Sequence, residues 1–411
     1  MSLNALQTYS VNGGSPVEAV IPQALVPDKI ARPALPDLKF RCISSPSTNG
    51  NSVSAGNSAF FSLVNQGMIK GQSMYLKCTI TPNVACTFKG GVGAQSLINR
   101  LILSSGGVAE VLPNYATYSQ ILYRNNTGVN YVVADAAVME GAAITPGVPT
   151  GTDLTNIPVS GLDVCFPLLS NIFGSTRAFP TFMLNQPLQV ECALNSIKDA
   201  VYLAAGGITS LVISNLSLIY ECIYPGVEYE NMCRQKAMER GGLNFQFMSY
   251  LNHQFTTTSG GSANFTGGVG KSSVCAVLHA CVPTSEFNDQ KAPTQLTKNG
   301  QSAQRLYLDG QLALNYDITS SSQNLIEYQK ATNCAYDINT TLACTAATYN
   351  SVAYTTGFNT RAFNENIISG VSVNQLQYQS TGATVDCTNY LYVLYNANCV
   401  ISADGVLSVQ A

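Results

Sequence analysis

Apolar and polar residues alternate in short runs along most of this chain, and clusters of Gly, Asn, Ser and Thr separate the runs. In residues 71–81, for example, Met74, Leu76, Cys78 and Ile80 occupy every second position. A period of two places such side chains on one face of a β-strand, and the polar clusters are typical of turns. We therefore expect strands in residues 38–42, 71–81, 96–104, 187–195, 210–223, 242–255, 274–282, 305–316, 371–379 and 389–401.

Two segments carry helical signals instead. Residues 113–123 begin with Pro and place Tyr115, Tyr118 and Ile121 near helical spacing. Residues 227–240 place acidic residues before basic ones, in the order that the helix dipole favours, and a Gly-Gly pair follows. This second helix lies just past the middle of the chain, where a link between two β units would be expected.

A proline-rich segment precedes the first strand. Prolines recur between apolar residues at positions 16, 22, 27, 33 and 36, and this density prevents both helices and central strands. Because residues 1–36 also carry few charges, unlike a solvated tail, we expect an extended arm that lies along a neighbouring surface. Residues 136–158 and 329–359 lack a strand pattern and are predicted to be long loops.

The two halves of the chain repeat a faint common pattern. Residues 99–103 resemble residues 304–308, and residues 188–190 resemble residues 376–378. Each half also ends in a long apolar strand region. Because these matches keep their order at similar offsets, they predict two copies of one β-sandwich.

The chain is unusually poor in charge. It has 20 Lys+Arg and 23 Asp+Glu in 411 residues, so that 10% of its residues are charged, whereas an ordinary soluble domain has roughly 25%. Free monomers use surface charge to stay apart and to prevent pairing at sheet edges. We therefore expect this surface to be covered by other copies of the chain, or to lie outside the cell with polar uncharged residues. Either case favours a structural protein over a free cytosolic enzyme.

The charge pattern also bears on nucleic-acid binding. The net charge is −3 and no block of basic residues occurs; the N-terminal segment has only Lys29 and Arg32. Proteins that bind nucleic acid need clustered Lys and Arg to displace counterions from phosphate. We therefore expect no direct contact with nucleic acid.

The thirteen cysteines are dispersed and form no Cys-x-x-Cys pair. Several, such as Cys192 and Cys222, lie inside apolar strand-like runs, which favours buried free thiols over a disulfide framework. The N-terminal residues lack the charged and apolar regions of a secretory signal, so folding in a reducing compartment is expected.

Residues 201–220 carry no charge but contain Gly206-Gly207, and we interpret them as a turn with a long strand, or two strands, rather than a membrane span.

Candidate catalytic or ligand-binding residues are few. His253 and His279 lie in separate strand-like runs without the further ligands that a metal site needs, so both are assigned structural roles. Glu286, Asp289 and Lys291 occupy a polar loop that we expect to be solvated. The sequence therefore predicts no catalytic, cofactor-binding or metal site, and no cofactor.

Glycine-containing motifs are interpreted as turns. Asp309-Gly310 and Asp404-Gly405 are typical of hairpin turns. The glycine-rich residues 90–93 and 267–270 lack the Lys-Ser and the helix of a phosphate-binding loop, so both segments are predicted to be turns.

The layout resembles that of the double jelly-roll major capsid proteins, the family of adenovirus hexon, tectiviruses, corticoviruses and large icosahedral DNA viruses. The likeness rests on the strand–Gly-Gly–helix run 96–123, the strand pair 207–224, the linking helix 227–240 and the apolar C-terminal strands. It implies an all-β fold of two tandem eight-stranded jelly-roll β-sandwiches with few short helices. The implied domains are an N-terminal extended arm (1–36), a first jelly roll (37–226), a linking helix (227–241) and a second jelly roll (242–411).

The same resemblance implies a function. It suggests a structural major capsid protein, not an enzyme, that self-assembles as pseudo-hexagonal homotrimers tiling an icosahedral virion shell. The implied partners are further copies of the chain, minor capsid or penton proteins, and an internal viral membrane. The protein would be made in the host cytoplasm, and loops 136–158 and 329–359 would form outward towers.

Three other functions fit parts of the pattern. A secreted β-sandwich adhesin or carbohydrate-binding module would share the low charge, and it predicts ordered disulfides. A single-jelly-roll RNA-virus coat with a protruding domain could reach this length, but such coats often have a basic N-terminal arm, and this arm is apolar. A β-rich enzyme predicts a deep pocket with titratable residues in close contact.

Overall fold

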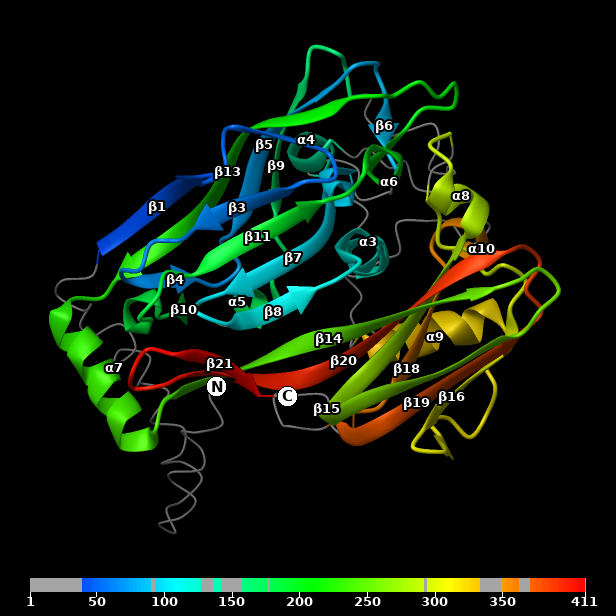
Figure 1. Cartoon of the computed structure of the whole chain (residues 1–411). Coiled ribbons are helices and arrows are strands. Elements are labelled where there is room, and N and C mark those ends of the chain that lie inside the picture. The colour runs from blue at the N-terminus through cyan, green and yellow to red at the C-terminus, as the bar shows by residue number, and fades with distance from the viewer. Residues whose placement is uncertain are drawn as a thin grey trace, which may run out of the picture.

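The fold is dominated by antiparallel strands that form two side-by-side units (Figure 1). The computed structural model describes residues 39–89, 93–126, 136–141, 157–175, 178–291, 294–332, 349–361 and 370–410. The predicted arm, residues 1–36, lies outside the described residues, and so do residues 142–156 and 333–348 of the two predicted loops.

The first unit consists of two sheets with eight main strands between them. One sheet has the order β1 (Lys39–Pro46), β13 (Leu211–Tyr224), β5 (Tyr75–Pro82), β9 (Leu162–Pro167), with the short strands β2 (Ser52–Ser54), β4 (Met68–Lys70) and β10 (Ala178–Phe179) at its margins. The other has the order β3 (Ser58–Ser62), β11 (Gln189–Leu194), β7 (Ile98–Ser104), β8 (Val108–Leu112). Along the chain, the first main strand pairs with the eighth, the second with the seventh, the third with the sixth and the fourth with the fifth. This nesting of pairs is that of a jelly roll.

The second unit repeats the nested pairing. Its strands are β14 (Leu243–Thr257), β15 (Ala263–Pro283), β16 (Ser302–Leu308), β17 (Gln311–Leu312), β18 (Thr355–Asn359), β19 (Val371–Thr381), β20 (Cys387–Ile401) and β21 (Leu407–Gln410). β15 serves as two strands, because its first part pairs with β19 and its last part pairs with β20 and β18. With β15 counted twice, the order of pairs is β14·β20, β15·β19, β15·β18 and β16·β17. The chain therefore contains two jelly rolls.

β15 bends where it passes from one sheet to the other. Its pairing with β19 shifts register between Gly268 and Lys271 and again before Val274, and Gly270 has a φ of 58°. The prediction of a turn at residues 267–270 is wrong, because these glycines bend a strand rather than end it. Glycine permits both the positive φ and the bulge that such a bend requires.

The predicted internal repeat is confirmed. β7 and β16, which contain the first pair of similar segments, are both the fourth strand of their roll, and β11 and β19 are both the seventh. Leu101 lies opposite Cys192, whereas the matching Leu306 lies opposite Tyr378. The sequence match, which aligned Val190 with Tyr378, is therefore offset by two residues. An even offset leaves each side chain on the same face of its strand.

The two predicted helices are present, and the structure adds a third long one. α3 (Tyr115–Asn126) and α7 (Val227–Arg240) fall where they were expected, and the left-handed Gly241 follows α7. α9 (Ser321–Ala331) was not predicted. Shorter helices are α4 (Ala136–Glu140), α5 (Asn171–Ser175), α6 (Ile197–Ala200), α8 (Thr284–Asn288), α10 (Tyr349–Val352) and the 3-10 turns η2 (Gly93–Leu97) and η4 (Thr181–Met183).

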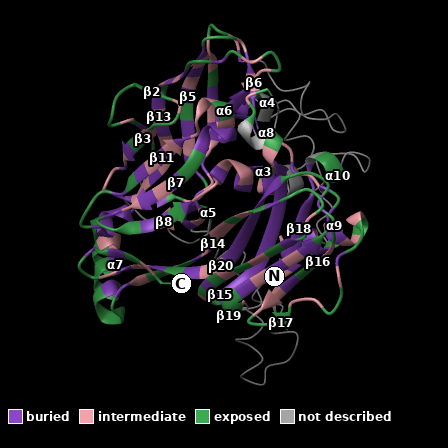
Figure 2. Ribbon diagram, turned by 45° about the vertical axis from the view of Figure 1, so that its right-hand side comes forward, coloured by how far each residue is buried: buried purple, intermediate pink, exposed green. Residues whose placement is uncertain are grey.

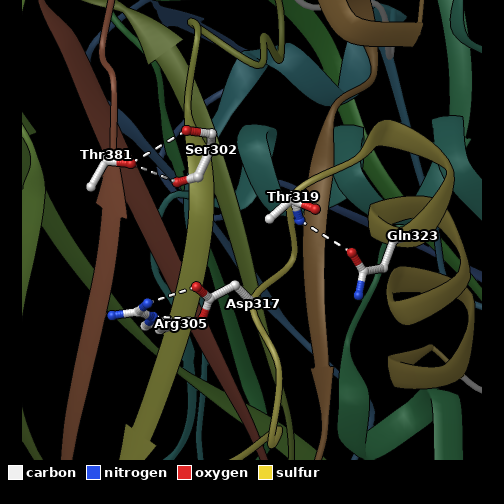
Figure 3. A network of polar contacts seen from close by, with 6 residues as sticks. All are labelled: Ser302, Arg305, Asp317, Thr319, Gln323 and Thr381. Atoms are coloured by element: carbon white, nitrogen blue, oxygen red, sulfur yellow. Dashed lines mark hydrogen bonds and ion pairs between the residues drawn. The ribbon is translucent and has the colours of Figure 1, made fainter.

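The start of α9 explains why it forms. The hydroxyl of Ser320 accepts a hydrogen bond from the backbone N–H of Gln323 at 3.2 Å. The Gln323 side chain accepts one from the N–H of Thr319 at 3.1 Å, as Figure 3 shows. This reciprocal arrangement is close to a capping box, which satisfies N–H groups that have no partner inside the helix. The Ser-x-x-Gln spacing at Ser320 and Gln323 is therefore a sequence signal for the start of α9.

Several other predictions can be compared with the structure. Asp309 and Gly310 have φ angles of 48° and 82° and form the expected hairpin turn, so residues 305–316 are a hairpin and not one strand. Asp404-Gly405 likewise joins β20 to β21. Residues 201–220 form the short strand β12 (Val201–Tyr202), which pairs with β6 (Thr87–Phe88), then a turn and β13. Within the described residues, no helix is long and apolar enough to cross a membrane.

Two clusters of buried hydrophobic residues stabilise the molecule. One lies between the two sheets of the second roll and includes Leu306, Tyr378 and Val393. The other fills the first roll and extends without a break to the facing sheet of the second roll, where it includes Tyr392 and Leu278. The two rolls therefore share a hydrophobic core.

Candidate functional site: the seam between the two rolls

The interface between the rolls, the seam, is formed by α3, α5 and neighbouring loops of the first roll and by β14, β15 and β20 of the second. The first part of β20, residues 387–394, and the last part of β15 are buried on both faces, as the long purple stretches in Figure 2 show. Tyr392 and Leu278 lie opposite each other on the seam face, whereas Val393 and Val277 lie opposite each other on the interior face of the roll. A strand with both faces buried needs the nearly continuous apolar composition that these strands have.

Three tyrosine rings form the centre of the seam. The ring of Tyr118, on α3, lies 4.1 Å from that of Tyr250 and 5.3 Å from that of Tyr392, centroid to centroid. Tyr250 and Tyr392, on adjacent strands of the second roll, are 5.3 Å apart in an edge-to-face arrangement. Such aromatic pairs each contribute about 0.5–1.5 kcal/mol beyond the burial of their area.

Buried tyrosine hydroxyls orient α3 on the second roll. Tyr250 donates to the carbonyl of Pro113, Tyr392 to the carbonyl of Asn114, and Tyr328 of α9 to the carbonyl of Ile121, each at 3.0 Å. Burial raises the pKa of Tyr250 and of Tyr392 well above the usual value, so these hydroxyls keep the proton that they donate. Each bond satisfies a buried tyrosine hydroxyl, which would otherwise lose its hydrogen bond to water without a replacement.

A second set of polar contacts joins the rolls near β6 and α8 (Figure 1). The Lys89 ammonium donates to the carbonyl of Asp289 at 2.7 Å, and the N–H of Thr294 donates to the carbonyl of Lys89 at 2.8 Å. The Lys89 side chain is buried, and burial lowers its pKa to about 8.

The polar segment that contains Glu286 is only partly solvated. The prediction of a fully solvated loop is wrong for Glu286, because this residue is half-buried and burial raises its pKa to about 7. Asp289 and Lys291 are exposed, as expected.

Glu110, on β8, is a buried carboxyl beside the seam. It is 3% exposed and accepts hydrogen bonds from the Ser170 hydroxyl at 2.8 Å and the Asn171 N–H at 3.0 Å. Burial raises its pKa to about 7, although these hydrogen bonds act in the opposite direction. Through Asn171 the carboxyl anchors α5, and α5 packs on β14 of the second roll.

Two cavities lie along the seam. One, of about 220 Å³, is lined mainly by amide and hydroxyl side chains, and Asp199 and Tyr390 are the titratable groups that line it. The other, of about 320 Å³, lies between Met74 and Met248 and has no titratable side chain in its lining. Neither cavity brings together the paired nucleophile and base, or the paired carboxylates, that the enzyme alternative requires.

The two histidines lie on one face of the second roll's sheet, separated by Leu391 of the strand between them. The His279 ring is hydrogen-bonded to Asn389 at 2.9 Å and to Tyr378 at 3.0 Å, and burial lowers its pKa to about 4. His253 packs against the ring of Phe265. Within the described residues, no three His, Cys, Asp or Glu side chains come close enough together to hold a metal ion.

The cysteines in the described residues are buried free thiols, as predicted, with two exceptions. There are eleven of them, all free thiols, and nine of these eleven are buried. Cys165 is half-buried, and Cys42 on β1 is exposed. The ordered disulfides expected for a secreted adhesin are therefore absent among these eleven.

The similarity of this chain to known proteins is found in its structure and not in its sequence. No family model and no curated protein matches the sequence. The Faustovirus major capsid protein is 9% identical, has a TM-score of 0.63, and the match covers 97% of this chain and 98% of that one. VP54 of PBCV-1, fitted into a cryo-EM reconstruction of the virophage Sputnik, is 10% identical with a TM-score of 0.61, over 91% and 97% of the two chains. The mavirus major capsid protein is 12% identical with a TM-score of 0.52, over 90% of each chain.

Matches of such low identity over nearly whole chains concern the fold. They agree with the nested strand pairing found twice in this structure, and they exclude the single-jelly-roll alternative, which has one such unit. The chain therefore has the double jelly-roll fold of viral major capsid proteins.

Proposed function

We propose that this chain is a structural major capsid protein, made in the host cytoplasm and located in the virion shell, and that it is not an enzyme. The observation that carries the proposal is the shared core of the two rolls. It makes each chain a rigid pair of similar sandwiches. Three such pairs around a threefold axis present six similar rolls, so a homotrimer has the pseudo-hexagonal outline that tiles an icosahedral shell.

The domain boundaries are part of the same proposal. They are an arm at 1–36, a first roll at 37–226, a linking helix at 227–241 and a second roll at 242–411. Strand pairing supports them, because β1–β13 pair only with one another, β14–β21 pair only with one another, and α7 lies between the two sets in the described chain.

The proposed partners are other copies of this chain, then minor capsid or penton proteins and an internal viral membrane. The small number of charged residues supports extensive self-association, because the cores of permanent interfaces are depleted in charge. The net charge of −3, without a basic block, supports a shell that does not contact nucleic acid directly.

Native mass spectrometry of the purified full chain tests the proposal. We expect a species of three times the 43.6 kDa of one chain, and hexagonal particles of matching size in electron micrographs. A monomer at every concentration up to that of an assembly reaction would contradict the proposal.

A further inference from the structure

In the second roll, the sheet of β14, β20, β15 and β18 is covered on both faces. The equivalent sheet of the first roll, formed by β1, β13, β5 and β9, has one face uncovered. In β13, Leu218, Tyr220 and Cys222 are buried inside the first roll, whereas Ile219 and Ile223 point to the other side and are half-exposed. β1 and β13 lie at the outer margin of the molecule, on the side away from most of the second roll (Figure 1). This outward surface of the sheet, the open face, is formed by the apolar Phe40, Cys42, Tyr75, Ile219 and Ile223 and by the charged Lys70, Lys77 and Glu221.

The open face is more apolar than a solvated sheet face. Phe40 lies opposite Ile223 and Tyr75 lies opposite Ile219, so that two apolar pairs lie on either side of the Lys70–Glu221 ion pair. Phe40 is 54% exposed. Sheets with one solvated face normally carry polar residues there, and we interpret the two exposed apolar pairs as part of an interaction surface.

The seam indicates what covers the open face. Within one chain, the side of the first roll that carries α3 and α5 covers the β14–β20–β15 sheet of the second roll. This contact is heterologous, because it joins two different surfaces of the repeated unit. A ring of six similar rolls closes when the same heterologous contact is repeated at each junction, between chains as well as within them. The junction between two chains then places the corresponding side of one second roll on the open face of the next first roll.

The corresponding side of the second roll carries exposed apolar residues. α9 occupies the place of α3, because each helix lies between the fifth and sixth strands of its roll. Leu312 on β17, Tyr316 after it and Ile326 on α9 form the edge patch, and Ile326 is 51% exposed. The Tyr316 hydroxyl donates to the Glu327 carboxylate at 2.7 Å, which holds this part of the patch against α9.

We infer that the open face is the subunit interface, and that the edge patch of a second copy of this chain occupies it. The inference rests on the proposed assembly of the chain and specifies which surfaces meet.

Two variants test it, each with arginine in place of a partly exposed apolar residue so that the roll itself still folds. Ile223→Arg alters the open face, and Ile326→Arg alters the edge patch. We expect each variant to be a monomer in native mass spectrometry, with an unchanged far-UV circular dichroism spectrum. Met238→Arg, which introduces the same charge at an exposed apolar position of α7, is the matched control and is expected to remain a trimer.

Mixing the two variants tests the pairing of the surfaces. The Ile223→Arg chain keeps an intact edge patch, and the Ile326→Arg chain keeps an intact open face, so the mixture should form a heterodimer that neither variant forms alone. A wild-type trimer together with a trimeric Ile223→Arg variant would overturn the inference and leave the capsid proposal standing. A monomeric wild type would overturn both.

Cys42 gives an independent measurement, because its thiol lies in the open face and is exposed. Site-resolved maleimide labelling should be about tenfold or more slower in the wild-type trimer than in the Ile326→Arg monomer, since interface cores exclude solvent. Equal rates would overturn the inference. Protection of Cys42 in the monomer as well would also overturn it, because the face would then be covered by the same chain, for example by residues 1–38.

Discussion

Equivalent sheets of the two rolls have different surroundings, and their sequences differ accordingly. In the second roll, residues 274–283 of β15 are all buried, and apolar residues occur on both faces of the strand. In the first roll, β13 keeps a regular alternation between buried and partly exposed residues (Figure 2). The comparison shows that a strand face covered within the chain and a strand face available to another chain have different burial patterns, even when both faces are apolar.

The difference also orders the steps of assembly. The seam joins two parts of one chain, whose effective concentration for each other is high, so it forms as the chain folds. The open face has to remain soluble until a second chain arrives. Its Lys70–Glu221 ion pair, with 2.6 Å between nitrogen and oxygen, keeps charge on a face that is otherwise mostly apolar.

The largest expected effect is at the seam. Tyr392→Ala removes a fully buried ring together with its contacts to Tyr118 and Tyr250 and its hydrogen bond to Asn114, and should lower the free energy of unfolding by about 4 kcal/mol. The matched variant Ile219→Ala, on the open face, should lower it by about 1 kcal/mol in the dissociated chain. Urea denaturation followed by circular dichroism measures both. Equal losses of unfolding free energy in the two variants would contradict the proposed difference between the covered sheet and the open face.

The next effect is a dependence on pH. The folded-state pKa of Glu110, about 7, is above the usual 4.5, so folding takes up a proton between these values. Stability should therefore fall as the pH rises from about 4.5 to 7, by roughly 3 kcal/mol from this group, and then level off. In Glu110→Gln that part of the slope should be absent in urea titrations at about pH 5 and pH 8. Burial also raises the pKa of Glu286 to about 7, so Glu286→Gln should remove a similar part of the slope, and the double variant should lose more of it than either single variant. An unchanged slope in Glu110→Gln would show that the carboxyl is ionised at little cost.

A smaller effect is expected at the start of α9. Ser320→Ala removes the hydroxyl that accepts from the Gln323 N–H and should cost about 1 kcal/mol of stability. Because α9 carries Ile326 of the edge patch, the same variant should also weaken the trimer in a dilution series. Ser322→Ala is the control, because it removes an exposed hydroxyl that bonds the Ser320 hydroxyl at 3.2 Å but leaves the acceptor of the Gln323 N–H in place. If both variants behave alike, the cap does not hold the patch in place.

The smallest effect is expected at two surface ion pairs whose arginines occupy matching strand positions. Arg305 on β16 pairs with Asp317 at 2.5 Å (Figure 3), and Arg100 at the matching position of β7 pairs with Glu191 at 3.6 Å. Exposed pairs contribute little, because solvent and salt screen them. Asp317→Asn and Glu191→Gln should each leave the urea midpoint unchanged within error at physiological salt. A clear loss in only one variant would show that the two rolls use this position differently.

Strand positions were predictable where the alternation was regular. Met74, Leu76, Cys78 and Ile80 all proved to be buried, because one face of β5 lies against a core and the other does not. β18 was missed and placed in a predicted loop, since its Thr355, Thr356 and Gly357 carry no apolar signal. Gly357 is required there by the close approach of α9, where a Cβ atom would lie 2.6 Å from Tyr328. That requirement exists only once α9 is packed.

The seam was much less predictable than the strands. Tyr118 could be placed on an apolar face of a helix, but its partners Tyr250 and Tyr392 are more than 130 positions away in sequence. Lys89 gave no signal at all, because a buried lysine is recognised only by the distant groups that surround it.

The sequence by itself determined the order and type of most strands, their repetition in two halves, the linking helix and the low charge. These properties are local or cumulative, since each depends on the period of a short segment or on a sum over the chain. The tertiary structure decided which of two equivalent sheets is covered within the chain and which keeps an open face. Periodicity specifies that a strand has an apolar face, but only the packing of distant segments specifies what lies against it.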